Sequence, residues 1–343
     1  MQVASASQER KRPIAENSRN YNGIDLIKFL CAIMVFTIHI SPFQDTSFGA
    51  AQKLNSFFQG YLCRLAVPFF FVSSGFFLFR KMELSHLKTD VIRDYCFKIF
   101  RMIGIWSVLL VVGGTFHLWY MGATVVAMLL LNLCLRLGIR IRFVCVLAVV
   151  LYCVGLLGDS YYGLIAPLEN IAVFRYGIKG YAFFFESTRN GLFMAFIFVL
   201  MGALLAHSDT KMRPKTAMAG FAASMICLLA EYLLLELYSE PKDHNMYVCL
   251  LPAVYFLFSM AFSMNLKDRV IYRRLRNIGV LVYFLHIMVN KIVKLGISVV
   301  EKYLGTGCGA YEFLISLLLT FAVAVVIEWM SHKEKFRWLR WIY

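Results

Sequence analysis

The chain has 343 residues, of which 60% are hydrophobic and 16% are charged. Soluble domains contain about 25% charged and 45–50% apolar residues, so this composition excludes a water-soluble protein and indicates an integral membrane protein. The net charge of +15 comes from Lys and Arg clusters between apolar runs, the positive-inside pattern of membrane proteins, so we expect a lipid bilayer and no nucleic acid as partner.

The first 23 residues are polar and basic, without the apolar core of a signal peptide. We therefore expect residues 1–23 to form a cytoplasmic tail. Apolar runs of membrane length follow from Ile24 to Met330, and residues 331–343 are again basic. The sequence thus predicts one transmembrane domain over 24–330 between two cytoplasmic tails.

The apolar runs predict an all-α, polytopic bundle of about nine to ten transmembrane helices with a cytoplasmic N-terminus. The expected spans are 24–41, 61–79, 143–157, 190–206, 217–238, 247–265, 278–299 and 310–330. They alternate across the membrane only if 102–134 crosses twice, although two crossings need roughly forty residues. We therefore expect a short or re-entrant hairpin there, turning at Gly113 and Gly114, and a long external loop over 158–188.

The nine cysteines show no metal-ligand spacing. Several of them fall inside apolar runs, where cysteine behaves as a small hydrophobic residue. No CxxC pair or Cys/His pattern occurs in the sequence, so we expect no metal site.

The first span contains Asp25, Lys28 and His39. Charged groups within a bilayer usually face the protein interior and mark a pathway or site. Eleven residues separate Lys28 from His39, which places both on one helical stripe about 16 Å apart along the axis. Lys28 could meet an anionic group from the cytoplasm, and the His39 imidazole could act as a general base at the outer mouth. Alternatively, Lys28 reaches the interface and pairs with Asp25, while His39 ends the helix.

The second span offers Arg64 near its outer end and a Ser73-Ser74-Gly75 sequence within it. The Arg64 guanidinium could hold a carboxylate or orient a substrate. Ser74 could contact a substrate hydroxyl, although small residues at this position more often permit close helix packing.

Further candidates lie in four later segments. His117, Trp119 and Tyr120 follow the expected hairpin turn and could be interfacial anchors or site residues. His286 lies within a span, where an imidazole needs partners or a water-filled cavity. Glu231 raises the same question, and could instead be a neutral carboxyl group hydrogen-bonded to a neighbouring helix. Arg189 and Asn190 are either a site edge or a helix start.

In this order, these segments resemble the acyltransferase 3 family of membrane enzymes, which acylate hydroxyls or amines on envelope sugars and related acceptors. The segments that carry the resemblance are Lys28 with His39, 64–77, 117–120, 189–193 and 283–286. The resemblance implies an acyl donor such as acetyl-CoA as substrate, with no bound cofactor.

Within that family, residues 23–25, 158–160, 188–191 and 242–247 look like the membrane half of vancomycin-resistance serine racemases. In those proteins a cytoplasmic racemase domain follows the last span. This chain ends at Tyr343, so we expect no pyridoxal-phosphate domain and a separate racemase polypeptide as a possible partner. One departure is that the segment from Arg101 to Thr115 is shorter than the family pattern by about one span.

Two functional hypotheses follow, with a third in which the chain is an inactive relative or an envelope scaffold. In the first, an acyltransferase in the cell membrane binds a cytoplasmic donor near Lys28, and His39 activates the acceptor. Arg64, Arg189 and His286 would then position the acceptor or stabilise charge on the acyl oxygen.

In the second hypothesis, the protein takes up or senses L-serine. Arg64 or Arg189 would bind the carboxylate, and Glu231 or Asp25 would bind the ammonium group.

Overall fold

The computed structural model describes residues 21–42, 49–85, 90–110, 116–185, 187–208, 211–239, 241–304 and 309–343. All regular elements within these ranges are helices. In chain order they are α1 (Asn22–His39), α2 (Gly49–Gly60), η2 (Leu62–Leu65), α3 (Ala66–Leu84), α4 (Asp90–Leu109), η3 (Phe116–Leu118), α5 (Trp119–Arg136), α6 (Ile141–Leu157), α7 (Tyr162–Ile165), η4 (Ala166–Asn170), α8 (Ala172–Phe184), η5 (Gly191–Ala195), α9 (Phe196–His207), α10 (Pro214–Tyr238), α11 (Leu250–Ser263), α12 (Val270–Leu304), α13 (Gly309–Met330) and η6 (Glu334–Trp341).

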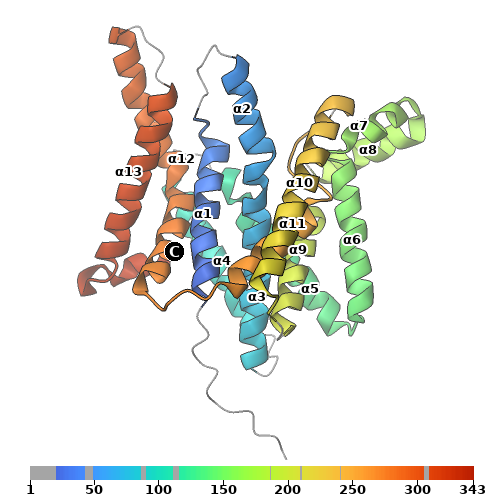
Figure 1. Ribbon diagram of the computed structural model, residues 1–343, viewed down its shortest axis with the longest axis horizontal. Coiled ribbons are helices and arrows are strands. Elements are labelled where there is room, and N and C mark those ends of the chain that lie inside the picture. Colours follow the sequence, from blue (N-terminus) through green and yellow to red (C-terminus); the bar gives the residue numbers. More distant parts are fainter. Residues whose placement is uncertain are drawn as a thin grey trace, which may run out of the picture.

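The helices form a bundle whose long members run roughly side by side (Figure 1). Within the described residues, six helical stretches are long and apolar enough to cross a membrane, or seven if α6 and the bent α7–η4 segment count as one span. The stretch Gly191–His207 and helix α11 are shorter apolar helices. The predicted fold class, a polytopic membrane helix bundle, is therefore confirmed.

The basic clusters gather at one end of this bundle. The links from α5 to α6 and from α11 to α12, together with η6, lie at the lower end in Figure 1. These segments include Arg140, Lys267 and Arg337. We call this end the basic end and the opposite one, where α2, α7 and α8 lie, the outer end. The positive-inside rule assigns the basic end to the cytoplasm.

Helices α3 and α9 pack with their backbones in direct contact. A Cβ atom on Gly75 would lie 2.2 Å from the carbonyl oxygen of Val199, and one on Gly202 would lie 2.1 Å from that of Val72. Small residues allow such close approach between membrane helices. The packing interpretation of the Ser-Gly sequence therefore describes Gly75, whereas Ser74 has a different position, described below.

We expect Gly202→Ala to destabilise the bundle by about 1–3 kcal/mol, because the added methyl group forces α3 and α9 apart. Gly104 on α4 is the matched control, because a Cβ there meets no atom within 4 Å. Gly104→Ala should leave the stability unchanged or raise it slightly. Thermal unfolding of the detergent-solubilised proteins measures both, and equal midpoints for the two variants would contradict the close contact.

The segment before His117 differs from the expected short hairpin. Helix α4 begins at Asp90, not near residue 102, because apolar residues already recur at helical spacing on its buried face. These buried residues are Val91, Ile92, Cys96, Ile99, Met102 and Trp106. Helix α4, which is the first half of the expected hairpin, is thus longer than predicted and carries charged residues on its other face. The expected turn at Gly113 and Gly114 lies outside the described residues, as do residues 1–20 of the N-terminal tail.

Three further segments are more structured than predicted. Helix α2 precedes the second span, and the external loop 158–188 contains α7, η4 and α8. The C-terminal tail forms η6 and packs on the bundle, where the Trp106 indole Nε1 donates a hydrogen bond of 2.7 Å to the Ile342 carbonyl oxygen. The last residues of the chain therefore pack into the interior of the bundle at the basic end.

Candidate functional site

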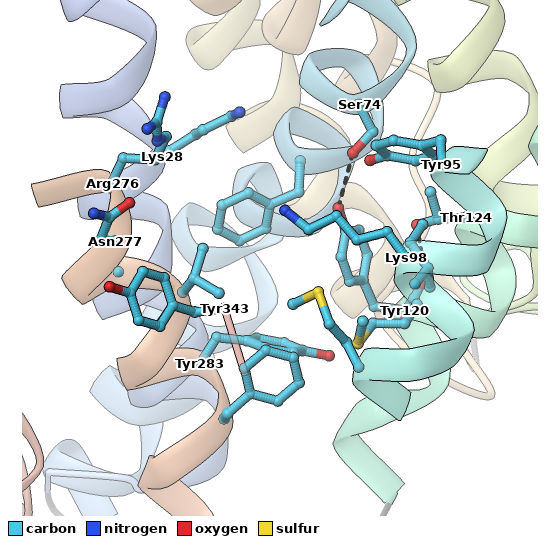
Figure 2. A pocket seen from close by; sticks show the side chains of 17 residues that line it. Lys28, Ser74, Tyr95, Lys98, Tyr120, Thr124, Arg276, Asn277, Tyr283 and Tyr343 are labelled. Carbon is cyan, nitrogen blue, oxygen red and sulfur yellow. Dashed lines mark hydrogen bonds between the residues drawn. The ribbon is translucent and has the colours of Figure 1, made fainter. Parts of the chain in front are cut away.

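A cavity of about 530 Å³ lies between α1, α3, α4, α5 and α12 (Figure 2). We call it the inner cavity. Its polar lining residues are Lys28, Ser74, Tyr95, Lys98, Tyr120, Thr124, Arg276, Asn277, Tyr283 and Tyr343. Lys28 and Arg276 both lie within the first two turns of helices that start at the basic end, so the cavity lies toward that end.

Three cations line the inner cavity. Lys28 and Arg276 lie together on one side, and Lys98 reaches in from the opposite side (Figure 2). The Lys28 Nζ atom lies 4.5 Å from the centre of the Phe77 ring. Asp25 is buried beside them, with its Oδ2 atom 3.8 Å from Nη1 of Arg276. Asp25 therefore pairs with Arg276 of α12. Three cations and one carboxylate leave the cavity with a net positive charge, which favours an anionic ligand.

Two tyrosines separate the inner cavity from the residues beyond it. The Tyr120 hydroxyl lies 3.2 Å from Oγ of Ser74, so Ser74 belongs to the cavity wall. The rings of Tyr120 and Tyr283 are 5.9 Å apart between centroids. The Tyr283 hydroxyl donates a hydrogen bond to the backbone carbonyl of His117. The far wall of the cavity is thus directly attached to His117.

Beyond this wall lie the three histidines proposed from the sequence, His39, His117 and His286. The His286 ring lies 5.1 Å from that of His39 and 5.3 Å from that of His117, measured between centroids. His286 is 0% and His117 is 3% exposed, whereas His39 is exposed at the last turn of α1. We call these three side chains the imidazole cluster. It brings together α1, η3 and α12 from distant parts of the sequence.

The buried members of the imidazole cluster have unsatisfied nitrogens. Nδ1 of His286 lies 3.1 Å from the Val282 carbonyl oxygen, which can only accept a hydrogen bond. Neutral His286 therefore carries its proton on Nδ1 and presents a lone pair at Nε2. That Nε2 atom and both ring nitrogens of His117 have no hydrogen-bond partner. Buried polar atoms are normally satisfied, so the cluster is suited to bind a polar group.

The imidazole cluster is not arranged as a metal site. Among the residues that the structure describes, no group of three or more His, Cys, Asp or Glu side chains is placed to hold a metal ion.

Two arginines stand near the imidazole cluster at the outer end. The charges of Arg64 and Arg189 both act on His39. The Arg189 guanidinium lies 5.8 Å from the Trp119 ring and 3.7 Å from Oδ2 of Asp243. Trp119 follows His117 by two residues, so the outer arginines and the cluster share one region.

Asp159 holds the outer segments together. It is 1% exposed, and its carboxylate accepts hydrogen bonds from five donors. They are the hydroxyls of Ser160 and Thr188, the backbone amides of Asn245 and Met246, and the side-chain amide of Asn245. Three of the four segments that share the racemase likeness, 158–160, 188–191 and 242–247, therefore meet at one carboxylate.

Two other candidates serve helix ends. The Asn190 side-chain oxygen accepts hydrogen bonds from the backbone amides of Leu192 and Phe193, which makes it the cap of η5. The Glu231 carboxylate accepts hydrogen bonds from the backbone amides of Val248 and Cys249 before α11, and another from the Tyr161 hydroxyl. In this structure both side chains are thus engaged in structural contacts.

A comparison with known families identifies the family of this chain. Residues 21–329 match the model of the acyltransferase domain that defines the acyltransferase 3 family. The chain belongs to this family. The match includes the imidazole cluster and every residue that lines the inner cavity except Tyr343. The acyltransferase 3 chain is a multi-pass membrane protein.

Curated relatives of this acyltransferase 3 chain carry racemase names. Two amino-acid racemases of Enterococcus faecalis are 31% and 30% identical to it, over 74% and 90% of this chain and 37% and 45% of their own lengths. A serine/alanine racemase of Enterococcus gallinarum is 28% identical, over 91% of this chain and 47% of its own length. The chain spans less than half of each relative. No solved structure matches the chain.

Proposed function

We propose that the protein transfers an acyl group from a cytoplasmic donor in the inner cavity to an acceptor at the imidazole cluster. The observation that carries this proposal is the adjacency of the two features, since Tyr283 lines the cavity and also holds the His117 backbone. A donor held by the cations at the basic end could present its acyl group at this wall. The acceptor would approach from the outer end, where His39 is exposed.

Acyl-CoA, such as acetyl-CoA, suits the inner cavity as donor. Its phosphates would meet Lys28, Lys98 and Arg276, and charge-assisted hydrogen bonds to phosphate are among the strongest in proteins. In this proposal the donor is a substrate and not a resident cofactor.

His39 would serve as the general base. It would take the proton from the acceptor hydroxyl or amine while that atom bonds to the acyl carbon, and the proton would pass to the sulfur as the thioester bond breaks. The lone pair at Nε2 of His286 can accept an N–H from a neighbouring imidazole, which would fix the His39 tautomer. The outer arginines Arg64 and Arg189 would position the acceptor.

The direct test is acyl transfer by the purified protein. We expect release of CoA from acetyl-CoA that depends on an added acceptor, with a panel of envelope sugars, amino sugars and hydroxy acids as candidates. Acylated product should appear in equal amount by mass spectrometry. Absence of acceptor-dependent release across donors of different chain length would overturn the proposal and favour a scaffold role.

Neutralising Lys28 should weaken donor binding. For Lys28→Gln we expect the KM for acetyl-CoA to rise about tenfold or more, because a charged hydrogen bond contributes about 1.5–3 kcal/mol. The KM for the acceptor should stay unchanged, because Lys28 lies at the opposite end of α1 from His39. Lys215→Gln is the control, since Lys215 is an exposed cation at the start of α10. A rise in the acceptor KM alone would contradict the placement of the donor.

A second candidate function is uptake or sensing of L-serine as part of a vancomycin-resistance type racemase system, with racemisation by a separate polypeptide. The racemase names of the curated relatives support it. Of the acids considered for the ammonium group, Glu231 is bound by backbone amides and Asp25 pairs with Arg276. Uptake of radiolabelled L-serine into proteoliposomes tests transport, and uptake no greater than that of empty vesicles would rule transport out; absence of L-serine binding to the purified protein would rule out sensing.

A further inference from the structure

Arg64 is a largely buried cation whose charge has no carboxylate in contact with it. Its Nη1 atom donates a hydrogen bond of 2.5 Å to Oδ1 of Asn245, which is a neutral group. Its Nε atom is buried and has no acceptor. In the described part of the chain Arg64 forms no ion pair, whereas its neighbour Arg189 pairs with Asp243. Buried charges in proteins are normally paired, so this guanidinium lacks an anionic partner.

The neutral partner of Arg64 is held in place by its own network. Asn245 is 3% exposed, and its side-chain amide donates a hydrogen bond of 3.0 Å to Oδ2 of Asp159. This contact turns the side-chain oxygen of Asn245 toward Arg64. Asp159 itself accepts five hydrogen bonds, so its charge is already stabilised by other groups. The fold therefore fixes the position of the guanidinium without neutralising it.

The exposed carboxylate of Asp243 is already engaged. Asp243 pairs with Arg189 at 3.7 Å, and both side chains are about two-fifths exposed. Exposed pairs of this kind contribute little and exchange readily with water. The charges of Asp243 and Asp159 both act on Arg64, but neither carboxylate forms an ion pair with it, and its Nε atom stays without an acceptor.

We propose that the Nε side of Arg64 binds an anionic group, carboxylate or phosphate, on the molecule that presents its nucleophile to the imidazole cluster. A guanidinium presents its N–H groups in a planar fork that matches the oxygens of either anion. The acceptor would thus be a small hydroxyl or amino compound that carries a negative charge, rather than a neutral sugar. The identity of this ligand as acyl acceptor rests on the proposed function, but the anion site can be tested by binding alone.

The test is isothermal titration of the purified full chain with three hydroxyl compounds: L-lactate, glycerol 1-phosphate and glycerol. We expect saturable binding of lactate, of glycerol phosphate or of both, and none of glycerol. The comparison of the two anions shows which one the site prefers. Arg64→Gln should weaken binding at least about tenfold, the loss expected for a charged hydrogen bond. Arg175→Gln is the matched control, because Arg175 is an exposed arginine of α8 at the outer end whose guanidinium contacts backbone carbonyls.

Arg64→Lys is a second test in case Arg64→Gln fails to fold, because it keeps the positive charge and removes the planar set of N–H groups. We expect it to bind the preferred anion more weakly than the original chain and more tightly than Arg64→Gln. Equal affinity of the original chain and of both variants, or binding of glycerol as tight as that of the anions, would overturn the anion site. Anion binding through Arg64 without acyl transfer from any donor would retain the site and remove the proposed function. Acyl transfer to lactate and to glycerol at equal rates, with both rates unchanged in Arg64→Gln, would retain the proposed function and remove the anion site.

Discussion

Replacing His39 by alanine is expected to lower the rate of acyl transfer by about 10²–10⁴-fold, the usual contribution of a positioned general base. His39 is the exposed member of the imidazole cluster, so it is the base that an acceptor from the outer end meets first. The KM for acetyl-CoA should change little, because the cations of the inner cavity remain in place. Initial rates of CoA release at saturating donor and acceptor measure the effect.

The matched control is His207→Ala. The His207 side chain is 89% exposed at the end of α9 and forms an ion-pair contact of 3.1 Å with Glu83, far from the cluster in sequence and at the basic end. This variant should retain full activity. Equal turnover of His39→Ala and the original chain would remove His39 from catalysis, and an equal loss in both variants would show that the assay reports general damage.

Replacing Asp159 by alanine is expected to destabilise the outer segments by at least about 3 kcal/mol, because it leaves several buried donors without an acceptor. Each unsatisfied buried group costs about 1–3 kcal/mol. The donors include the backbone amides of Asn245 and Met246, which have no freedom to turn elsewhere. The loss should be local first, because the carboxylate joins 158–160, 188–191 and 242–247.

Limited proteolysis of the outer segments, followed by mass spectrometry, measures this effect, together with thermal unfolding. Asp159→Ala should be cut within 158–190 much faster than the original chain. Asp268→Ala is the control, because Asp268 is exposed in the link between α11 and α12. Cleavage rates equal to those of the original chain would contradict the role of Asp159 as the centre of these segments. Loss of Asp159 should also weaken anion binding, since Asn245 holds Arg64.

Apolar runs and basic clusters in the sequence were sufficient to predict the bundle. Each apolar run became a helix, and the basic clusters within the described ranges lie at one end, because burial in lipid and charge asymmetry act on local sequence. The boundaries were less accurate where a helix carries charges on one face. Helix α4 begins among charged residues at Asp90, since its other face is buried against the bundle.

The positions of the candidate residues along their helices were predicted better than the way these residues group in space. Lys28 and His39 were assigned to opposite ends of one helix, and the structure places Lys28 at the inner cavity and His39 at the outer end of α1. The meeting of His39, His117 and His286 depends on how α1, η3 and α12 pack, which no local pattern specifies. The sequence placed His39 and His117 toward the outer side, whereas it placed His286 in the middle of the span 278–299.

Asp159 and Asn245 were missed as organising residues because polar residues in an external loop usually face water. Their roles follow from burial, which only the folded arrangement shows. For Glu231 the sequence left open a site residue or a carboxyl group hydrogen-bonded within the bundle, and its carboxylate accepts hydrogen bonds from the backbone before α11.

The most direct measurement of the central claim is sided acyl transfer in proteoliposomes of known orientation. Radiolabelled acetyl-CoA is supplied on the side of the basic end, and the acceptor that supports turnover in detergent is supplied on the other. We predict labelled product on the acceptor side, with CoA released on the donor side. Transfer only when donor and acceptor are on the same side would contradict a path from the inner cavity to the imidazole cluster.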